Sequence, residues 1–135
     1  MIRIKIVSND IDIVAKVVLI DQKDRVLMLK RSDYMEKFAG EWDLPGGHLK
    51  ADESLVDGLA RETKEETQLD VRDPVFLVKM NNLHFFFAAY DSQEVKISHE
   101  HTDYKFFEKS ELDSNEKFQK VALMAIQEKN RWKSN

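Results

Sequence analysis

The segment from Gly46 to Leu69 restricts the fold more than any other part of this 135-residue chain. It begins with two glycines and continues with helical periodicity through Glu62, Glu65 and Glu66. On a helix these three carboxylates share one face, with Cβ atoms about 5–6 Å apart, and repel one another by about 0.2–0.5 kcal/mol per exposed pair. They also lie near the helix C-terminus, where the macrodipole disfavours negative charge. A hard divalent cation such as Mg²⁺, which prefers carboxylate oxygens, would offset this cost.

The residues around the three glutamates predict a helix that packs closely against another group. Asp52 is expected to cap its N-terminus. Arg61 and Lys64 are the neighbouring cations, and neither is expected to lie squarely on the carboxylate face. Gly58, four residues before Glu62, lies on that face and costs about 1 kcal/mol relative to alanine. We interpret this glycine as a point of close approach, either to a bound substrate or to a neighbouring strand.

The spacing of these residues resembles the Nudix box, G-x(5)-E-x(7)-R-E-U-x-E-E-x-G-U, in which U is a bulky apolar residue. Two positions depart from the pattern. Thr63 stands where an apolar residue is usual, and Gln68 replaces the glycine that normally adopts the left-handed conformation and ends the helix. The second departure leaves the geometry of the helix exit open, although it removes no charged group. The matching residues are Gly47, Glu53, Arg61, Glu62, Glu65, Glu66 and Leu69.

The resemblance implies a hydrolase that cleaves a nucleoside diphosphate linked to another moiety, with Mg²⁺, or alternatively Mn²⁺, as cofactor. It implies that the carboxylates of Glu62, Glu65 and Glu66 bind the metal, with the backbone carbonyl of Gly46 as a further ligand. One carboxylate must stay free to accept a proton from the attacking water. By resemblance we assign that role first to Glu62.

The resemblance also assigns supporting roles within the same segment. Arg61 is expected to hold Glu53 or Glu62 in place through a charge-assisted pair and not to contact the substrate. Glu53 is expected to stabilise the box or to stand in the second shell of the metal. Gly47 allows a close approach by the substrate or the metal.

A second acidic candidate lies outside the box, at Glu100. The segment Glu100-His101-Thr102-Asp103-Tyr104 resembles the Glu-His-x-x-Tyr segment that many Nudix proteins carry before the last strand, whose glutamate reaches the metal site. In an extended segment His99 and His101 share a face and Glu100 points away, so a single site that uses all three is disfavoured. The alternative for this triplet is an exposed loop.

Arg31 and Trp42 are the candidate substrate contacts before the box. Arg31 ends a predicted strand where Nudix proteins often carry a basic residue that faces the substrate phosphates, and a solvated strand end is the alternative. The loop that follows holds Tyr34, Phe38 and Trp42, of which one would stack on a nucleobase while the others pack onto the core. Trp42 is our candidate for that contact.

The remaining pattern predicts a mixed α/β (α+β) fold, an α/β/α sandwich with one mixed sheet, as a single domain over residues 1–135. We expect a hairpin of residues 12–20 and 25–30, and a capping box of Asp113 and Glu116 that opens a terminal helix over residues 114–131. A short helical turn is expected at residues 110–112. The other expected strands are residues 1–7, 71–80, 83–90, 94–98 and 104–107.

Composition excludes several other classes of protein. The sequence contains no cysteine, which argues against disulfides and thiolate chemistry and is compatible with a cytoplasmic protein. It contains no signal peptide and no apolar run of about 18 residues that would span a membrane. A net charge of −4 argues against binding to long nucleic acids, and nothing in the sequence indicates an oligomeric state.

Among small-molecule partners, a nucleoside triphosphate cleaved to the monophosphate and pyrophosphate is the leading interpretation. ADP-ribose, dinucleoside polyphosphates and coenzyme A derivatives are the alternatives, as is a nucleotide-binding module without turnover. A structural Ca²⁺-binding protein is disfavoured, because the segment lacks the Asp/Asn-rich loop with a central glycine of an EF-hand.

Overall fold

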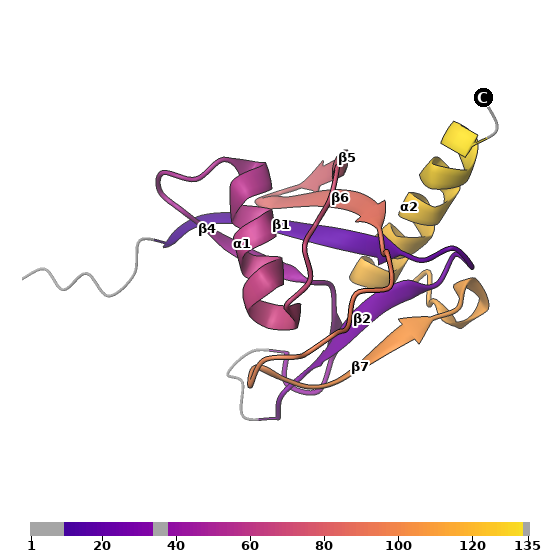
Figure 1. Ribbon diagram of the computed structural model, residues 1–135, viewed down its shortest axis with the longest axis horizontal. Coiled ribbons are helices and arrows are strands. Elements are labelled where there is room, and N and C mark those ends of the chain that lie inside the picture. The colour runs from indigo at the N-terminus through magenta and orange to yellow at the C-terminus, as the bar shows by residue number, and fades with distance from the viewer. Residues whose placement is uncertain (1–9, 34–37, 134–135) are drawn as a thin grey trace, which may run out of the picture.

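The computed structural model describes residues 10–33 and 38–133, and Figure 1 shows a mixed sheet with helices α1 and α2 packed against it. The strand expected over residues 1–7 and the aromatic Tyr34 lie outside these ranges. The elements are β1 (Asp10–Ile20), β2 (Val26–Arg31), β3 (Trp42–Asp43), β4 (Gly46–Lys50), α1 (Leu55–Thr67), β5 (Val75–Met80), β6 (Leu83–Ala89), β7 (His101–Phe107), the short 3-10 helix η1 (Lys109–Glu111) and α2 (Lys117–Lys133).

Strand β1 lies at the centre of the sheet and has partners of both directions. It pairs in parallel with β6, from Val14 opposite Leu83 to Ile20 opposite Ala89. It pairs antiparallel with β4, where Lys16 stands opposite Gly46. The β1–β2 hairpin is paired only at the turn, because β2 diverges there and forms its ladder with β7. The sheet is therefore mixed, as the α/β sandwich prediction requires.

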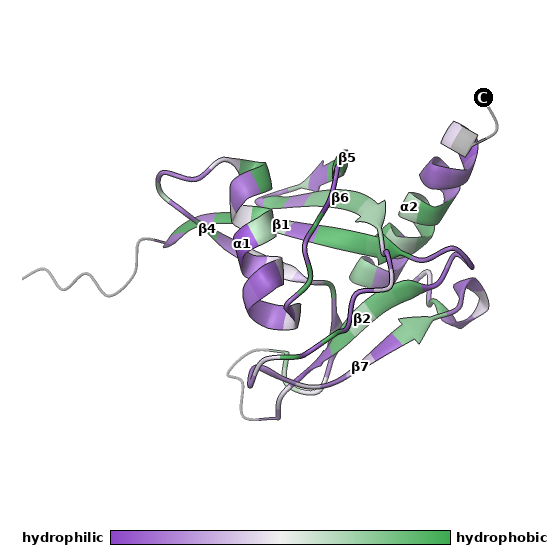
Figure 2. Cartoon of the chain, in the orientation of Figure 1, coloured by the Kyte–Doolittle hydropathy of each residue, from purple (hydrophilic) through white to green (hydrophobic). Residues whose placement is uncertain are grey.

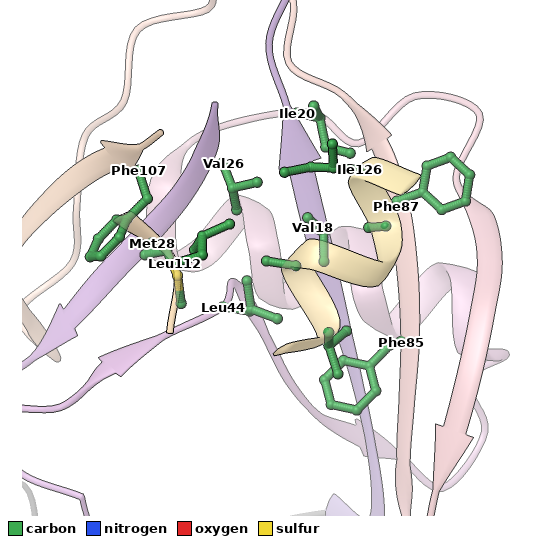
Figure 3. Close-up of a cluster of buried hydrophobic side chains, with 13 residues drawn as sticks. Val18, Ile20, Val26, Met28, Leu44, Phe85, Phe87, Phe107, Leu112 and Ile126 are labelled. Carbon is green, nitrogen blue, oxygen red and sulfur yellow. The ribbon is translucent and has the colours of Figure 1, made fainter. Parts of the chain in front are cut away.

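The two helices cover opposite faces of β1, because successive side chains of a strand point to opposite sides. Val17 and Leu19 face the cluster that contains Leu59 of α1. Val18 and Ile20 face α2, and Figure 3 shows Ile20 beside Ile126 of that helix. Four apolar side chains of α2 are buried, and Figure 2 shows the hydrophobic residues on its inner side and on the central strands; they are Val121, Ala122, Ala125 and Ile126.

Helix α1 begins and ends differently from the prediction. Its N-cap is Ser54 and not Asp52, because the Ser54 side chain accepts a hydrogen bond from the Asp57 N–H at 3.1 Å. At the other end, Gln68 adopts the left-handed conformation (φ 65°, ψ 12°), and its N–H donates to the Lys64 carbonyl. The helix exit expected of the missing glycine is therefore formed by a residue with a side chain, at some conformational cost.

The terminal helix starts three residues later than predicted, and the capping box at Asp113 is wrong. The Asp113 carboxylate accepts a hydrogen bond from the Asn115 N–H, which closes a local turn before the helix begins at Lys117. The capping box in this region is formed by Glu108 and Glu111 at η1 instead.

Two strand predictions also need correction. Residues 71–74 precede β5, which begins at Val75. Residues 94–98 form no strand, because their backbone N–H groups bond to the end of α1: Lys96 N–H donates to the Thr67 carbonyl and Ser98 N–H to the Glu66 carbonyl.

In the described ranges, neither α1 nor α2 combines the length and apolar character that crossing a bilayer demands.

Candidate active site

A cavity of about 530 Å³ lies where β1, β3 and β4 meet the carboxylate face of α1, the start of α2 and the loop before β7. It brings together most of the predicted site residues and leaves out Glu53, Arg61 and Glu65, which do not line it. The predicted residues on its wall are Arg31, Trp42, Gly46, Gly47, Glu62, Glu66 and Glu100.

Two glycines allow the helix carboxylates to reach this cavity. Gly46 has φ +128°, and a Cβ atom there would lie 2.1 Å from the backbone oxygen of Ala15 on β1. A Cβ atom on Gly47 would lie 2.5 Å from the Glu62 Oε1 atom. Because neither glycine has a side chain, β4 fits between β1 and α1, and the Gly46 N–H donates to Glu66 Oε1 at 3.0 Å.

Glu66 is the buried carboxylate of the cavity wall, with 7% of its surface exposed. Burial raises its pKa to about 8, while the Lys16 ammonium and the Gly46 N–H oppose that shift. Burial also raises the pKa of Glu62, and the negative charges of Glu65 and Glu100 add to it against the opposing effect of Arg61. Both carboxylates are therefore disfavoured as anions unless a cation joins them.

Arg61 pairs with three glutamates, Glu53, Glu62 and Glu65. Its guanidinium donates to both carboxylate oxygens of Glu53, at 2.6 and 2.9 Å, and to the His48 carbonyl at 3.0 Å. It also reaches Glu62 at 3.2 Å and Glu65 at 3.3 Å. The expectation that Arg61 lies off the carboxylate face is wrong, because the long side chain extends back across it.

The same guanidinium sets the ionisation of Glu53. The hydrogen bonds from Arg61, followed by that from the Lys50 N–H, lower the pKa of Glu53 to about 2. Glu53 therefore stays charged and links α1 to the end of β4. Gly58 packs in the same region, since a Cβ atom there would lie 2.7 Å from the Leu49 Cγ atom. Of the two alternatives for this glycine, the structure shows the neighbouring strand.

Glu100 reaches the cavity on a loop that is tied at both ends. Ser32, at the end of β2, donates its N–H to the Glu100 carbonyl and its hydroxyl to the His99 carbonyl, each at 2.9 Å. On the other side, the bond from Ser98 to the Glu66 carbonyl joins the loop to the last turn of α1. The exposed-loop alternative is wrong for His101, which is 5% exposed.

Sequence reasoning missed Lys16 and Asp43, which both line the cavity. Lys16 lies 3.0 Å from Asp43, whose other carboxylate oxygen accepts from Arg31 at 3.3 Å. Arg31 is thus held by a buried carboxylate and is not a solvated strand end. The available signal was a lone lysine inside the apolar run of β1, because lysine is rarely buried without a partner. Trp42 lies against Phe107, with ring centroids 5.1 Å apart, while it also lines the cavity.

The donor set fits a hard divalent cation, although the described ranges contain no group of three His, Asp or Glu side chains already arranged around a metal position. Glu62 and Glu66 share the cavity wall, and Glu100 is close enough to affect the charge of Glu62. Mg²⁺ and Mn²⁺ prefer oxygen ligands, and the carboxylates of these side chains supply them. Glu65, by contrast, is largely exposed and faces Arg61, so its predicted role as a ligand stays a prediction.

Comparison with known proteins points to one family. The family model described as NUDIX domain matches residues 11–129. The zebrafish (Danio rerio) protein named "m7GpppN-mRNA hydrolase NUDT17" is 34% identical over 64 residues, which are 47% of this chain and 21% of that protein. A "MutT-like protein" of Streptomyces ambofaciens is 41% identical over 54 residues, or 40% of this chain and 32% of that protein.

The fold is shared with solved structures over nearly the whole chain. The crystal structure of a MutT protein from Methanosarcina mazei Go1 has a TM-score of 0.68 and 25% identity, and the match covers 93% of this chain and 99% of that chain. The curated relatives are longer, since the matched segment is a third of their length or less. The sequence similarity is therefore to a segment of each of those proteins.

Proposed function

The chain belongs to the NUDIX domain family, whose hydrolases act on phosphoric anhydride bonds and generally use divalent metal ions, and from that premise we propose that it is a pyrophosphohydrolase dependent on Mg²⁺, or on Mn²⁺. One observation carries the proposal: the carboxylate of Glu66 is 7% exposed on the wall of a cavity, beside that of Glu62. A buried negative charge of this kind is costly unless a cation or a proton neutralises it.

The carboxylates of Glu66 and Glu100 and the backbone carbonyl of Gly46 would hold the cation, while Glu62, which the resemblance also names as a ligand, keeps a carboxylate oxygen free to accept a proton. When bound, the cation neutralises the diphosphate, orients it and lowers the pKa of water. Glu65 completes the set in the prediction from the resemblance, although its side chain lies outside the cavity beside Arg61.

The chain's own residues then divide the remaining work. The oxygen of a water molecule attacks a phosphorus atom, the bridging P–O bond breaks, and the carboxylate of Glu62 accepts the proton that the water loses. Arg61 and Glu53 keep Glu62 in position through the ion pairs described above. Arg31 and Trp42 face the substrate from the cavity wall, and Gly47 leaves room for its phosphates.

We propose a nucleoside triphosphate as the substrate, cleaved to the monophosphate and pyrophosphate. A volume of about 530 Å³ is in the range of pockets that take a single small ligand. The name of the zebrafish relative directs attention to the m7GpppN cap of mRNA as a second class of substrate.

A hydrolysis screen tests this proposal. Purified protein is incubated with the eight common nucleoside triphosphates, ADP-ribose, diadenosine tetraphosphate, a cap analogue and coenzyme A, with Mg²⁺, with Mn²⁺ and with EDTA. We expect metal-dependent release of pyrophosphate from at least one triphosphate and none from the Glu62→Gln variant. Binding of nucleotides without turnover under every condition would instead support the non-catalytic module.

A further inference from the structure

Lys16 is a charged side chain at the floor of the cavity that neither the box nor the mechanism above uses. It lies in the middle of β1, opposite Gly46 of β4 and Phe85 of β6. Its side chain is 10% exposed and lines the cavity. Burial of an ammonium group is costly unless hydrogen bonds and an opposite charge offset it, so this position requires an explanation.

The described contacts satisfy only part of this ammonium group. Its Nζ atom donates to the Leu44 carbonyl at 3.1 Å and lies 3.0 Å from the Asp43 Oδ1 atom. It also lies 5.6 Å from the centre of the Phe118 ring, which is a weak cation–π contact. A lysine ammonium has three N–H donors and no acceptor. The described ranges supply acceptors for two of them, on the side of Asp43 and Leu44.

Asp43 holds two cationic side chains on this wall of the cavity. Asp43 is 5% exposed and is shared by two cations, Lys16 and Arg31. Its Oδ1 atom accepts a further hydrogen bond, from the Leu44 N–H at 2.8 Å. The carboxyl groups of Glu62, Glu66 and Glu100 line the same cavity, so cationic and acidic side chains both face it.

We propose that Lys16, held in place by Asp43, contacts the substrate directly and donates its remaining N–H to a phosphate oxygen of the diphosphate. This inference rests on the proposed function, since it names a further contact of the same site. Asp43 is then a positioning residue that holds two cations, Lys16 and Arg31. The competing explanation is that Lys16 only fastens β3 to β1 through Asp43 and offsets the charge of Glu66.

Binding measurements separate the two explanations. The probe is imidodiphosphate, a pyrophosphate analogue whose N–H bridge resists hydrolysis, premixed with Mg²⁺ and titrated calorimetrically. A charge-assisted hydrogen bond contributes about 1.5–3 kcal/mol, so Lys16→Met should weaken binding by about tenfold or more. Lys16→Arg, which keeps the charge, should recover a large part of the affinity. Mn²⁺ alone should bind Lys16→Met at least as tightly as the wild type, because a cation has been removed from the cavity.

A double variant controls for loss of binding through misfolding. Lys16→Met alone leaves the carboxylate of Asp43 with Arg31 as its one remaining cationic partner among the described contacts. Lys16→Met with Asp43→Asn removes both charges and keeps the volume of both side chains. If Lys16 contacts phosphate, the double variant folds and still binds imidodiphosphate about tenfold more weakly. Wild-type affinity in the folded double variant, or in Lys16→Met itself, overturns the inference.

The controls also separate failure of this inference from failure of the proposed function. If the wild-type protein binds the probe but hydrolyses no nucleotide, the proposed function is contradicted. The binding measurements on the Lys16 variants then still test whether Lys16 contacts the phosphate. Wild-type protein that hydrolyses a nucleotide while Lys16→Met keeps normal affinity and normal KM contradicts the inference and leaves the proposed function intact.

Discussion

Two glutamates packed around α1 have opposite electrostatic environments. Beside Arg61, Glu53 forms two hydrogen bonds with the guanidinium, which lower its pKa to about 2. On the cavity wall, burial raises the pKa of Glu66 to about 8, and the Lys16 ammonium and the Gly46 N–H only partly compensate. We call Glu53, Arg61 and Glu65 the outer cluster, and Glu62 and Glu66 the inner pair.

On the proposed function, one residue type serves structure in the outer cluster and chemistry in the inner pair. The outer cluster carries its own cation, Arg61, which joins Glu53 and the His48 carbonyl of β4 to α1. In the inner pair, Glu62 shares Arg61 and Glu66 is partly offset by the Lys16 ammonium, and both line the cavity. Burial of these carboxylates without full compensation favours their protonated form until a cation joins them.

The largest expected effect comes from the inner pair. Glu62→Gln keeps the shape of the side chain but removes the base, so kcat should fall by about 10²–10⁴-fold. Circular dichroism and thermal unfolding should remain close to those of the wild type. Turnover measured under saturating Mg²⁺ checks this, and a rate like that of the wild type would remove Glu62 as the base.

Replacing the cation of the outer cluster should have a smaller effect on the reaction. Arg61→Lys keeps the charge but cannot form the two parallel hydrogen bonds to Glu53 or reach Glu62 at the same time. Groups that orient metal ligands typically contribute 10–100-fold, so the Mg²⁺ concentration at half-maximal rate should rise by about that factor. Arg72→Lys, on an exposed arginine outside the cavity, is the matched control.

The raised pKa of Glu66 predicts how stability depends on pH in the metal-free protein. Between its ordinary value of 4.5 and about 8, the folded protein binds a proton that the unfolded chain has lost. The free energy of unfolding in EDTA should therefore decrease as pH rises through this window, by up to about 1.4 kcal/mol per pH unit. Glu66→Gln should flatten the slope, and urea unfolding at several pH values measures it. An equal slope in the variant would assign the effect to other groups.

The smallest expected effect is at Glu65, which is largely exposed beside Arg61. Solvent-exposed ion pairs contribute about 0–1 kcal/mol. If Glu65 belongs only to the outer cluster, Glu65→Gln should therefore change the free energy of unfolding by less than about 1 kcal/mol and the Mg²⁺ affinity by less than about fivefold. A loss of Mg²⁺ affinity comparable to that of Glu66→Gln would instead show that Glu65 swings away from Arg61 to bind the metal, as the resemblance implies.

The sequence predicts much of this arrangement because the decisive signals are local. The spacing of Glu62, Glu65 and Glu66 fixes their common helix, and the apolar stripe of α2 fixes its buried face. The residue types of the box also indicate a metal-dependent hydrolase. The structure shows the fold that these patterns predict, including the mixed sheet and the two covering helices.

What the sequence does not predict depends on contacts between distant residues or on the path of a long side chain. The parallel pairing of β1 with β6 joins segments about 70 residues apart and has no local signal. The reach of Arg61 across the carboxylate face depends on its rotamer. Residues 94–98 have an acceptable strand pattern, but they bond to Glu66 and Thr67 instead. The role of Lys16 was not predicted, because an apolar run predicts that a segment is buried but does not identify the ion-pair partner of a single charged residue within it.

The most direct test of the central claim is the number of protons released when a divalent cation binds. Mn²⁺ is titrated calorimetrically at pH 7 in buffers of different ionisation enthalpy, which separates proton release from binding. With a pKa of about 8, Glu66 is mostly protonated before the metal arrives, so close to one proton should be released per bound ion, and almost none by Glu66→Gln. Tight binding with no proton released, or the same release from the variant, would contradict the account that the buried glutamate is held ready for the metal.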